Sequence, residues 1–232
     1  MEFFREGLFE AYHLIVSLDP LVMGAALRTV WISTLAVAVA TIIGLPVGTF
    51  LAQVRFPGRT LIVLIFRAGM AVPTVFIGLI CYGLFSRQGP AGALELLFEP
   101  WAIVIGEFLL ALPIVLSITH GAIKSLDARV GETALTLGAS RVRRWQTYVS
   151  EARRGVMLAV LTAFARCVTE LGIAMMVGGN IRGRTRTLAT ATALETVQGE
   201  FARAMAMGVI LLLIAVLVMV VIVGLGRENE TK

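Results

Sequence analysis

Five long apolar runs alternate with polar segments along the chain. A helix needs ~20 predominantly apolar residues to cross the ~30 Å hydrocarbon core of a bilayer, and each run is close to that length. The pattern therefore predicts an all-α polytopic membrane protein with five transmembrane helices. We expect these helices at about residues 30–50, 61–85, 101–118, 156–177 and 204–225.

A shorter amphipathic segment precedes the first run. Between residues 2 and 16, apolar residues recur at helical spacing on one face, and glutamates and His13 lie on the opposite face. This segment is too polar to cross a membrane, and Asp19 and Pro20 interrupt it. We therefore divide the chain into an N-terminal amphipathic helix at residues 1–20 and a transmembrane domain at residues 21–232.

The composition supports a membrane protein. Of the 232 residues, 58% are hydrophobic and only 15% are charged, whereas about a quarter of a soluble domain is charged. The net charge of +5 comes from basic residues that gather in particular loops, which is typical of membrane orientation signals. We expect contact with membrane lipid and no nucleic-acid partner.

The sequence lacks the patterns of a catalytic chain. It has no G-x-x-x-x-G-K-[ST] phosphate loop, so we expect no ATP bound in that way, and no nucleophile–His arrangement in a plausible cleft. Cys81 and Cys167 lie far apart inside apolar runs, and neither histidine has a ligand at metal spacing. We expect a protein that is not an enzyme and that holds no cofactor or metal of its own.

The distribution of basic residues predicts the orientation in the membrane. The polar segment 124–154 between the third and fourth runs holds seven of the twenty Lys and Arg residues. If this segment is cytoplasmic, five spans put eleven basic residues on its side and seven on the other. We therefore expect an outside N-terminus and a cytoplasmic C-terminus.

Segment 124–154 has the pattern of two short amphipathic helices. Gly138 allows a sharp turn between them because it lacks a Cβ, and Val142 and Trp145 can share one face of the second helix. Such a pair can lie across the end of a bundle and enter a groove on a partner protein. An ordinary cytoplasmic loop that its arginines hold to anionic lipid would fit the same pattern.

The spacing Glu-x-Ala-x-x-x-Gly-Ala-Ser in this segment resembles the EAA loop of ABC importer permeases of the binding-protein-dependent type. The resemblance implies a type I importer permease fold, a homodimer in a bacterial or archaeal inner membrane, a separate dimer of ABC ATPase subunits that carries ATP and Mg, and an extracytoplasmic binding protein. The chain has Ser150–Glu151 and Arg154 where the family often has Leu-Pro and a second Pro. The residues that the resemblance assigns to ATPase coupling are Glu132, Ala134, Gly138, Ala139, Ser140, Arg141, Arg144 and Trp145.

A second resemblance concerns the substrate. The stretches 170–180, 185–188, 194–196 and 199–201 are similar to permeases for tetrahedral oxyanions, most of all to the tungstate-type branch, and partly to molybdate and sulfate permeases. The resemblance implies a permease that moves the anion by alternating access. A channel or secondary transporter that needs no ATPase is the alternative from another class, and it would be expected to carry ionisable residues along a midplane relay.

The segment after the fourth run carries chemistry that suits an oxyanion. Guanidinium groups and hydroxyls donate hydrogen bonds, and an oxyanion offers only acceptor oxygens. The same arginines would also suit an outer surface that pairs with lipid phosphates or with acidic patches on a binding protein. The residues that we consider for an anion pathway or gate are Gly178, Gly179, Asn180, Arg182, Arg184, Thr185, Arg186 and Thr187.

Two ionisable residues lie four apart inside the fourth run. An unpaired charge in the middle of a membrane costs at least ~2.5 kcal/mol, so a partner is expected. Arg166 and Glu170 are within reach on one helical face. We interpret them as an intramembrane ion pair with a structural role, and a role in lining a pore stays open.

Overall fold

The computed structural model describes residues 2–227, and every regular element in that range is helical. The elements are α1 (Glu2–Val16), α2 (Pro20–Gln53), α3 (Arg59–Gly69), α4 (Thr74–Phe85), the 3₁₀ turn η1 (Gly92–Leu94), α5 (Pro100–Lys124), α6 (Ala128–Thr136), α7 (Arg141–Glu151), α8 (Arg153–Val168), α9 (Gly172–Gly178), α10 (Leu188–Gln198) and α11 (Phe201–Arg227).

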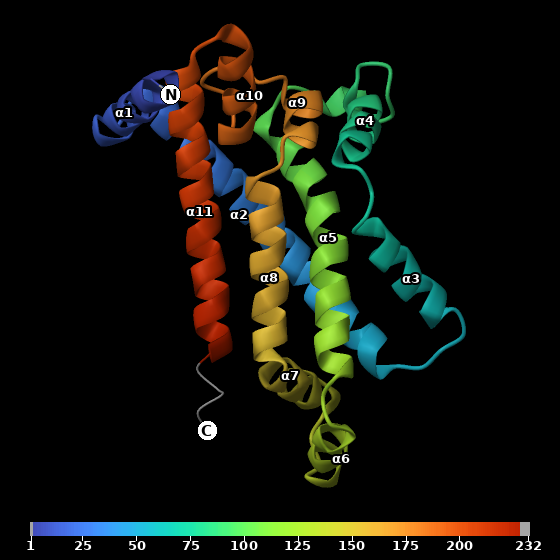
Figure 1. Cartoon of the computed structure of the whole chain (residues 1–232). Coiled ribbons are helices and arrows are strands. Elements are labelled where there is room, and N and C mark those ends of the chain that lie inside the picture. The colour runs from blue at the N-terminus through green and yellow to red at the C-terminus, as the bar shows by residue number, and fades with distance from the viewer. Residues whose placement is uncertain (1, 228–232) are drawn as a thin grey trace.

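Three helices are long and apolar enough to cross a membrane, and two bent helix pairs bring the number of crossings to five if each pair is one span. Together they form an elongated bundle (Figure 1). The helices α2, α5 and α11 each cross in one piece, and the pairs α3–α4 and α8–α9 make the two return crossings. The helices α6 and α7 lie at the end toward which α11 runs, and α1, α4, α9 and α10 lie at the other end. The five apolar runs of the sequence thus correspond to the five crossings.

Two of the crossings are broken helices. The axes of α3 and α4 meet at 99°, and those of α8 and α9 meet at 56°. The first break ends at Pro73, which lacks a backbone N–H and disfavours a helical conformation in the residue before it. At the second break, Glu170 Oε1 accepts a hydrogen bond from the backbone N of Ile173, at 3.0 Å, and so caps the first turn of α9. Hydropathy indicates the length of these runs but not their bends.

The close packing of α2 on α5 organises the core. A Cβ at Gly48 would lie 2.8 Å from the carbonyl oxygen of Leu116, and a Cβ at Gly44 would lie 3.2 Å from Val115 Cγ1. Two glycines four residues apart let helix backbones approach each other. Pro46 lies between them, and α2 continues through it as one helix. The buried apolar cluster spreads from this contact over α4, α8 and α9.

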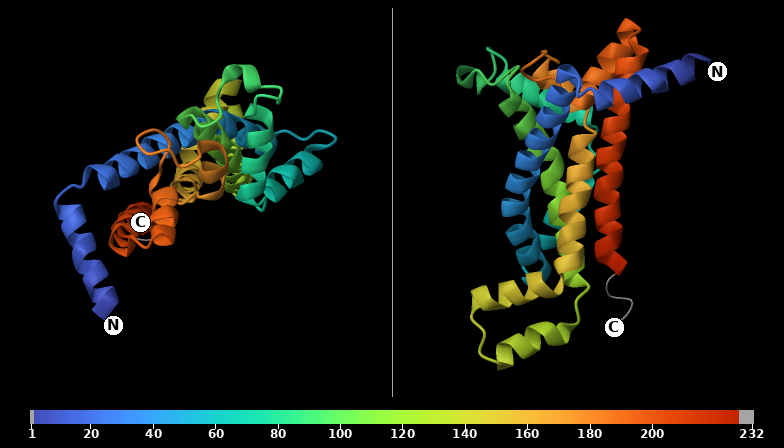
Figure 2. Two further views of the ribbon diagram at one scale, coloured as in Figure 1. Left: turned by 90° about the horizontal axis from the view of Figure 1, so that it is seen from above. Right: turned by 90° about the vertical axis from the view of Figure 1, so that its left-hand side faces the viewer.

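The helix α1 lies across the end of the bundle, not along it, and contacts α11 (Figure 2). Asp19 Oδ1 accepts hydrogen bonds from the backbone N of Leu21 and Val22, at 2.9 and 3.1 Å, so it caps α2 where α1 has ended. The predicted amphipathic segment forms this separate helix. Residue 1 and the charged tail at 228–232 lie outside the described residues.

Candidate coupling surface and anion passage

The helices α6 and α7 form a pair that projects from one end of the bundle (Figure 2). Gly138 lies in the turn between them with a φ of 73°, a left-handed conformation that favours glycine. Ser140 Oγ accepts a hydrogen bond from the backbone N of Arg143, at 3.3 Å, and so caps α7. Two residues that the sequence assigns to coupling therefore shape the turn.

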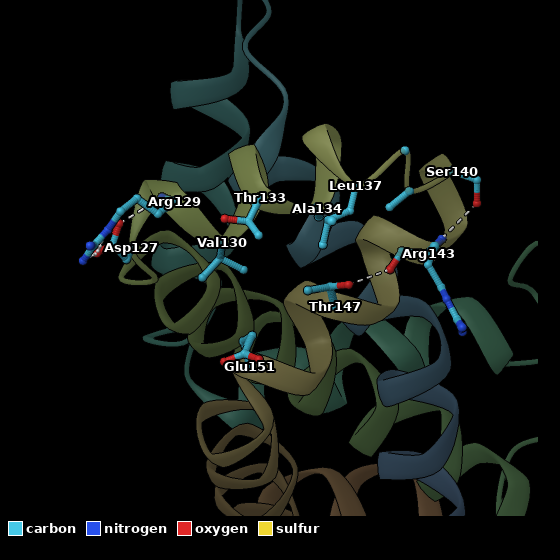
Figure 3. Close-up of a pocket in the computed structure, with 12 residues that line it drawn as sticks. Asp127, Arg129, Val130, Thr133, Ala134, Leu137, Ser140, Arg143, Thr147 and Glu151 are labelled. Carbon is cyan, nitrogen blue, oxygen red and sulfur yellow. Dashed lines mark hydrogen bonds and ion pairs between the residues drawn. The ribbon is translucent and has the colours of Figure 1, made fainter.

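An open cleft of about 980 Å³ separates α6 from α7. Figure 3 shows Val130, Thr133 and Ala134 on the α6 side of this cleft, with Thr147 and Glu151 on the α7 side. The walls are thus mostly small or polar. A cleft of this shape, at the end of a projecting helix pair, offers a surface that a second protein can enter.

The tip of the pair is apolar as well as basic. Leu137 is 80% exposed, and Leu135 and Val142 are also exposed. Several large apolar side chains exposed together, rather than one alone, can mark a contact site. The sequence placed Val142 on a face of the second helix, but it did not lead us to Leu135 and Leu137. Their position just before the turn at Gly138, in a polar segment, could have identified them as exposed apolar residues.

The residues predicted for coupling divide into two groups. Glu132, Gly138, Ser140 and Arg141 are exposed, and Ala139 is half-buried beside them. The other three turn inward: Ala134 is buried, and Arg144 and Trp145 are half-buried with Nε and Nε1 inaccessible to solvent.

A close contact determines the spacing of α6 and α7. A Cβ at Gly131 on α6 would overlap with the hydroxyl of Tyr148 on α7. Sequence reasoning missed both residues, because nothing in a local pattern indicates which glycine faces which aromatic side chain.

An exposed ion pair lies where the chain enters α6. Asp127 Oδ1 accepts a hydrogen bond from the backbone N of Arg129, at 2.9 Å, and Arg129 Nη2 lies 2.6 Å from Asp127 Oδ2. The Arg129 guanidinium lowers the pKa of the Asp127 carboxyl, and Asp127 raises the pKa of Arg129. The carboxyl therefore stays ionised at neutral pH and caps α6 as an anion.

The exit from the pair is a one-residue turn. α7 ends at Glu151, Ala152 is buried, and α8 begins at Arg153. A Cβ at Gly155 would overlap with Ala122, so the first turn of α8 lies directly against α5. Ser150, Glu151 and Arg154, which stand where the family often has prolines, therefore lie at the junction of α7 and α8.

At the opposite end, the segment after α9 folds around its own side chains. Gly179 and Asn180 follow α9 with φ values of 67° and 51°. The hydroxyl of Thr185 donates to the carbonyl of Gly178, at 2.5 Å, and accepts from the backbone N of Ile181, at 2.9 Å. Thr187 caps α10 and is buried. These two threonine hydroxyls hold the loop in shape.

Two of the three arginines in this segment have carboxylate partners. Arg184 forms an ion pair with Glu99 before α5, and Arg186 Nη1 lies 3.4 Å from Glu195 Oε1 on α10. Among the described residues, Arg182 is exposed and has no hydrogen-bond or ion-pair partner. Of these three arginines, only Arg182 therefore remains unpaired among the described residues.

The predicted pair inside the fourth crossing is within contact distance. Arg166 Nη1 lies 3.0 Å from Glu170 Oε2, at the break between α8 and α9. The Glu170 side chain is almost fully buried, whereas that of Arg166 is 44% exposed.

A protein-family profile matches most of this sequence. The profile described as "Binding-protein-dependent transport system inner membrane component" matches residues 44–227. The chain belongs to this family. It is therefore a non-catalytic permease, a multi-pass inner-membrane component whose transport system also includes a binding protein and an ATPase subunit.

Two relatives of this permease are described as tungstate uptake system permease protein TupB. The protein from Peptoclostridium acidaminophilum is 33% identical over 87% of this chain and 88% of its own length. The protein from Campylobacter jejuni is 36% identical over 87% of this chain and 84% of its own length.

A solved structure shows the same fold. A chain in the structure titled "Inward facing conformations of the MetNI methionine ABC transporter" superposes with a TM-score of 0.68, at 20% identity, over 93% of this permease and 97% of that chain. The expected type I importer permease fold is confirmed.

Proposed function

We propose that this chain is the permease of an ATP-driven tungstate importer. The observation that carries the proposal is the similarity to tungstate uptake permeases over nearly the whole chain, which includes the outer loop and the projecting helix pair. Among residues 182–187, Arg182 has a guanidinium without a carboxylate partner, and its N–H groups can donate to a tetrahedral dianion. Molybdate and sulfate have the same shape and charge, so they are the competing substrates.

The helix pair α6–α7 docks on the ATPase subunit. Its exposed Leu137 and Val142 enter a groove on that subunit, and the arginines around them bind acidic groups at its rim. ATP and Mg bind to the ATPase, and this chain holds no cofactor. The assembly contains two copies of the permease on two ATPase subunits, with the anion pathway at the two-fold axis.

The α6–α7 end is cytoplasmic, and the end with α1 and α10 faces the binding protein. This orientation follows from the excess of basic residues at the α6–α7 end. A membrane-impermeant thiol reagent added to intact cells tests it. We expect the reagent to label Val197→Cys, at the C-terminal end of α10, and to leave Leu137→Cys unlabelled, and the reverse pattern would invert the orientation.

Transport occurs by alternating access. Closure of the ATPase dimer moves α6 and α7, and the rigid helices α5 and α8, which join them directly, carry this motion to the far end. A binding event shifts such an equilibrium only if its contacts differ between the two states. The helix pair must therefore contact the ATPase differently in each state.

The decisive experiment replaces Gly138 by Pro in the complete transporter. Proline cannot adopt a positive φ and loses the hydrogen bond that the Gly138 N–H donates to Leu135. Gly199→Pro is a matched control, because Gly199 also follows a helix with a positive φ and donates a similar bond at the opposite end.

We expect G138P to abolish co-purification with the ATPase and tungstate uptake, and G199P to keep the ATPase bound. Unchanged ATPase binding and uptake in G138P would refute coupling through this pair. Uptake that persists without any ATPase would instead favour a channel or secondary transporter. Competition between tungstate, molybdate and sulfate for the binding protein identifies the anion.

A further inference from the structure

The C-terminal end of α8 carries a charged side chain on its exposed side. Arg166 and Thr169, the residue that ends the helix, are exposed, and Thr162 is half-buried, whereas Met157 and Leu158 nearer the start of α8 are exposed apolar residues. By contrast, the most exposed positions of α11 are apolar: Leu212, Leu213, Val216, Leu217 and Val220. In Figure 1, α8 lies between α5 and α11 with α2 behind it.

The depth of Arg166 makes its exposure informative. It lies thirteen residues beyond Arg153, the first residue of α8, which places it about 20 Å along the helix and well inside a hydrocarbon core of ~30 Å. A guanidinium that faced lipid at this depth would be strongly disfavoured, and the ion pair with Glu170 keeps it from moving toward either surface. The Arg166 guanidinium therefore faces water or a polar partner, not lipid.

The ion pair leaves most of the guanidinium available. Both oxygens of Glu170 are engaged, one with Arg166 Nη1 and one with the backbone N of Ile173. Among the described contacts, Arg166 uses only Nη1, so the remaining donors on its exposed side are unused. A guanidinium can present two parallel N–H groups to a tetrahedral oxyanion.

We propose that Arg166 is the mid-membrane contact of the transported oxyanion, and that Glu170 is the fixed counter-charge that keeps this contact weak. The inference rests on the proposed function, because it names a residue on the pathway of that anion. A neutralised guanidinium attracts a dianion less than a free one does, and an anion that is held weakly can leave again. Thr169, one turn before the α9 helix, lies at the edge of the same path.

The first test measures which side of α8 meets water. Thr169→Cys and the control Leu213→Cys on α11 are introduced into the full transporter in proteoliposomes, and each is exposed to a charged, membrane-impermeant thiol reagent. The native Cys81 and Cys167 are buried. We expect T169C to react and L213C to stay unreacted, with tungstate slowing the reaction of T169C. Equal and slow labelling of both variants would overturn the inference.

The second test separates transport from stability. We expect Arg166→Gln to lower tungstate uptake per assembled complex by at least about tenfold, Arg166→Lys to recover part of it, and Glu170→Gln to lower KM together with the maximal rate. A purely structural pair would instead reduce the amount of assembled complex and its Tm in all three variants, with uptake per complex unchanged, and this result would overturn the proposal.

The two proposals fail in different ways. If the wild-type transporter takes up tungstate but T169C is unreactive, or is not protected by the anion, only the role of Arg166 is refuted. If the wild type takes up no oxyanion in the presence of its ATPase and binding protein, the proposed function itself is refuted.

Discussion

The hydroxyl of Tyr148 on α7 occupies the space in which a side chain at Gly131 of α6 would begin. This contact brings the two helices of the projecting pair together on the bundle side of Gly138, and the cleft opens beside it. The surface that we propose to dock on the ATPase is therefore shaped by one glycine and one aromatic residue that lie seventeen positions apart.

Gly131→Val is expected to push α7 away from α6 and to weaken ATPase binding. Overpacking of this kind costs about 1–3 kcal/mol. Because the overlapping atom is the hydroxyl oxygen, the double variant Gly131→Ala with Tyr148→Phe should bind the ATPase better than Gly131→Ala alone. Gly121→Ala on α5, where an added Cβ meets nothing within 4 Å, is the control. Co-purification of the ATPase measures the effect, and equal binding by all four proteins would contradict the contact.

Leu137→Asp should abolish ATPase binding without unfolding the permease. Leu137 is 80% exposed, so its replacement leaves no cavity, and a charge at the centre of a docking surface weakens binding by at least about tenfold. Val197→Asp is matched in exposure, at 85%, and lies at the opposite end of the bundle. Binding isotherms with the isolated ATPase should separate the two variants, and similar isotherms would show that the tip does not dock.

Thr185→Val should lower the Tm of the purified permease, because it leaves the carbonyl of Gly178 and the backbone N of Ile181 without their partner. A buried group left unsatisfied costs about 1–3 kcal/mol. Thr185→Ser keeps the hydroxyl and should recover most of the loss. A Ser variant that is as unstable as the Val variant would show that the methyl group, and not the hydroxyl, holds this loop.

Arg182→Gln should raise the KM for uptake more than Arg184→Gln does. The Arg184 guanidinium is neutralised by Glu99, whereas Arg182 is free to meet an arriving anion. Arg186→Gln should instead reduce the amount of folded protein, since it leaves the buried Glu195 without its partner. Uptake at graded tungstate concentrations, normalised to assembled complex, provides the measurement, and equal KM values for Arg182→Gln and wild type would remove Arg182 from the anion path.

Local sequence patterns were sufficient to predict the apolar crossings and the position of the projecting helices α6 and α7. Apolar length depends only on consecutive residues, and Asp19, Pro20 and Gly138 act through their own backbone neighbours. For the same reason, the i, i+4 pair of Arg166 and Glu170 was accessible from spacing alone. The apolar segments of the permease could thus be predicted from the order of the residues alone.

Contacts between distant segments were decided only by the tertiary structure. Glu99 neutralises Arg184 from 85 positions away, and Glu195 neutralises Arg186 from the next helix, so two of the three arginines that looked free in the sequence are paired. The bend between α8 and α9 follows Arg166 directly, and Glu170 within this bend is the buried partner of Arg166. Charge is a property of a residue, but its availability to an anion depends on which carboxylates the fold places beside it.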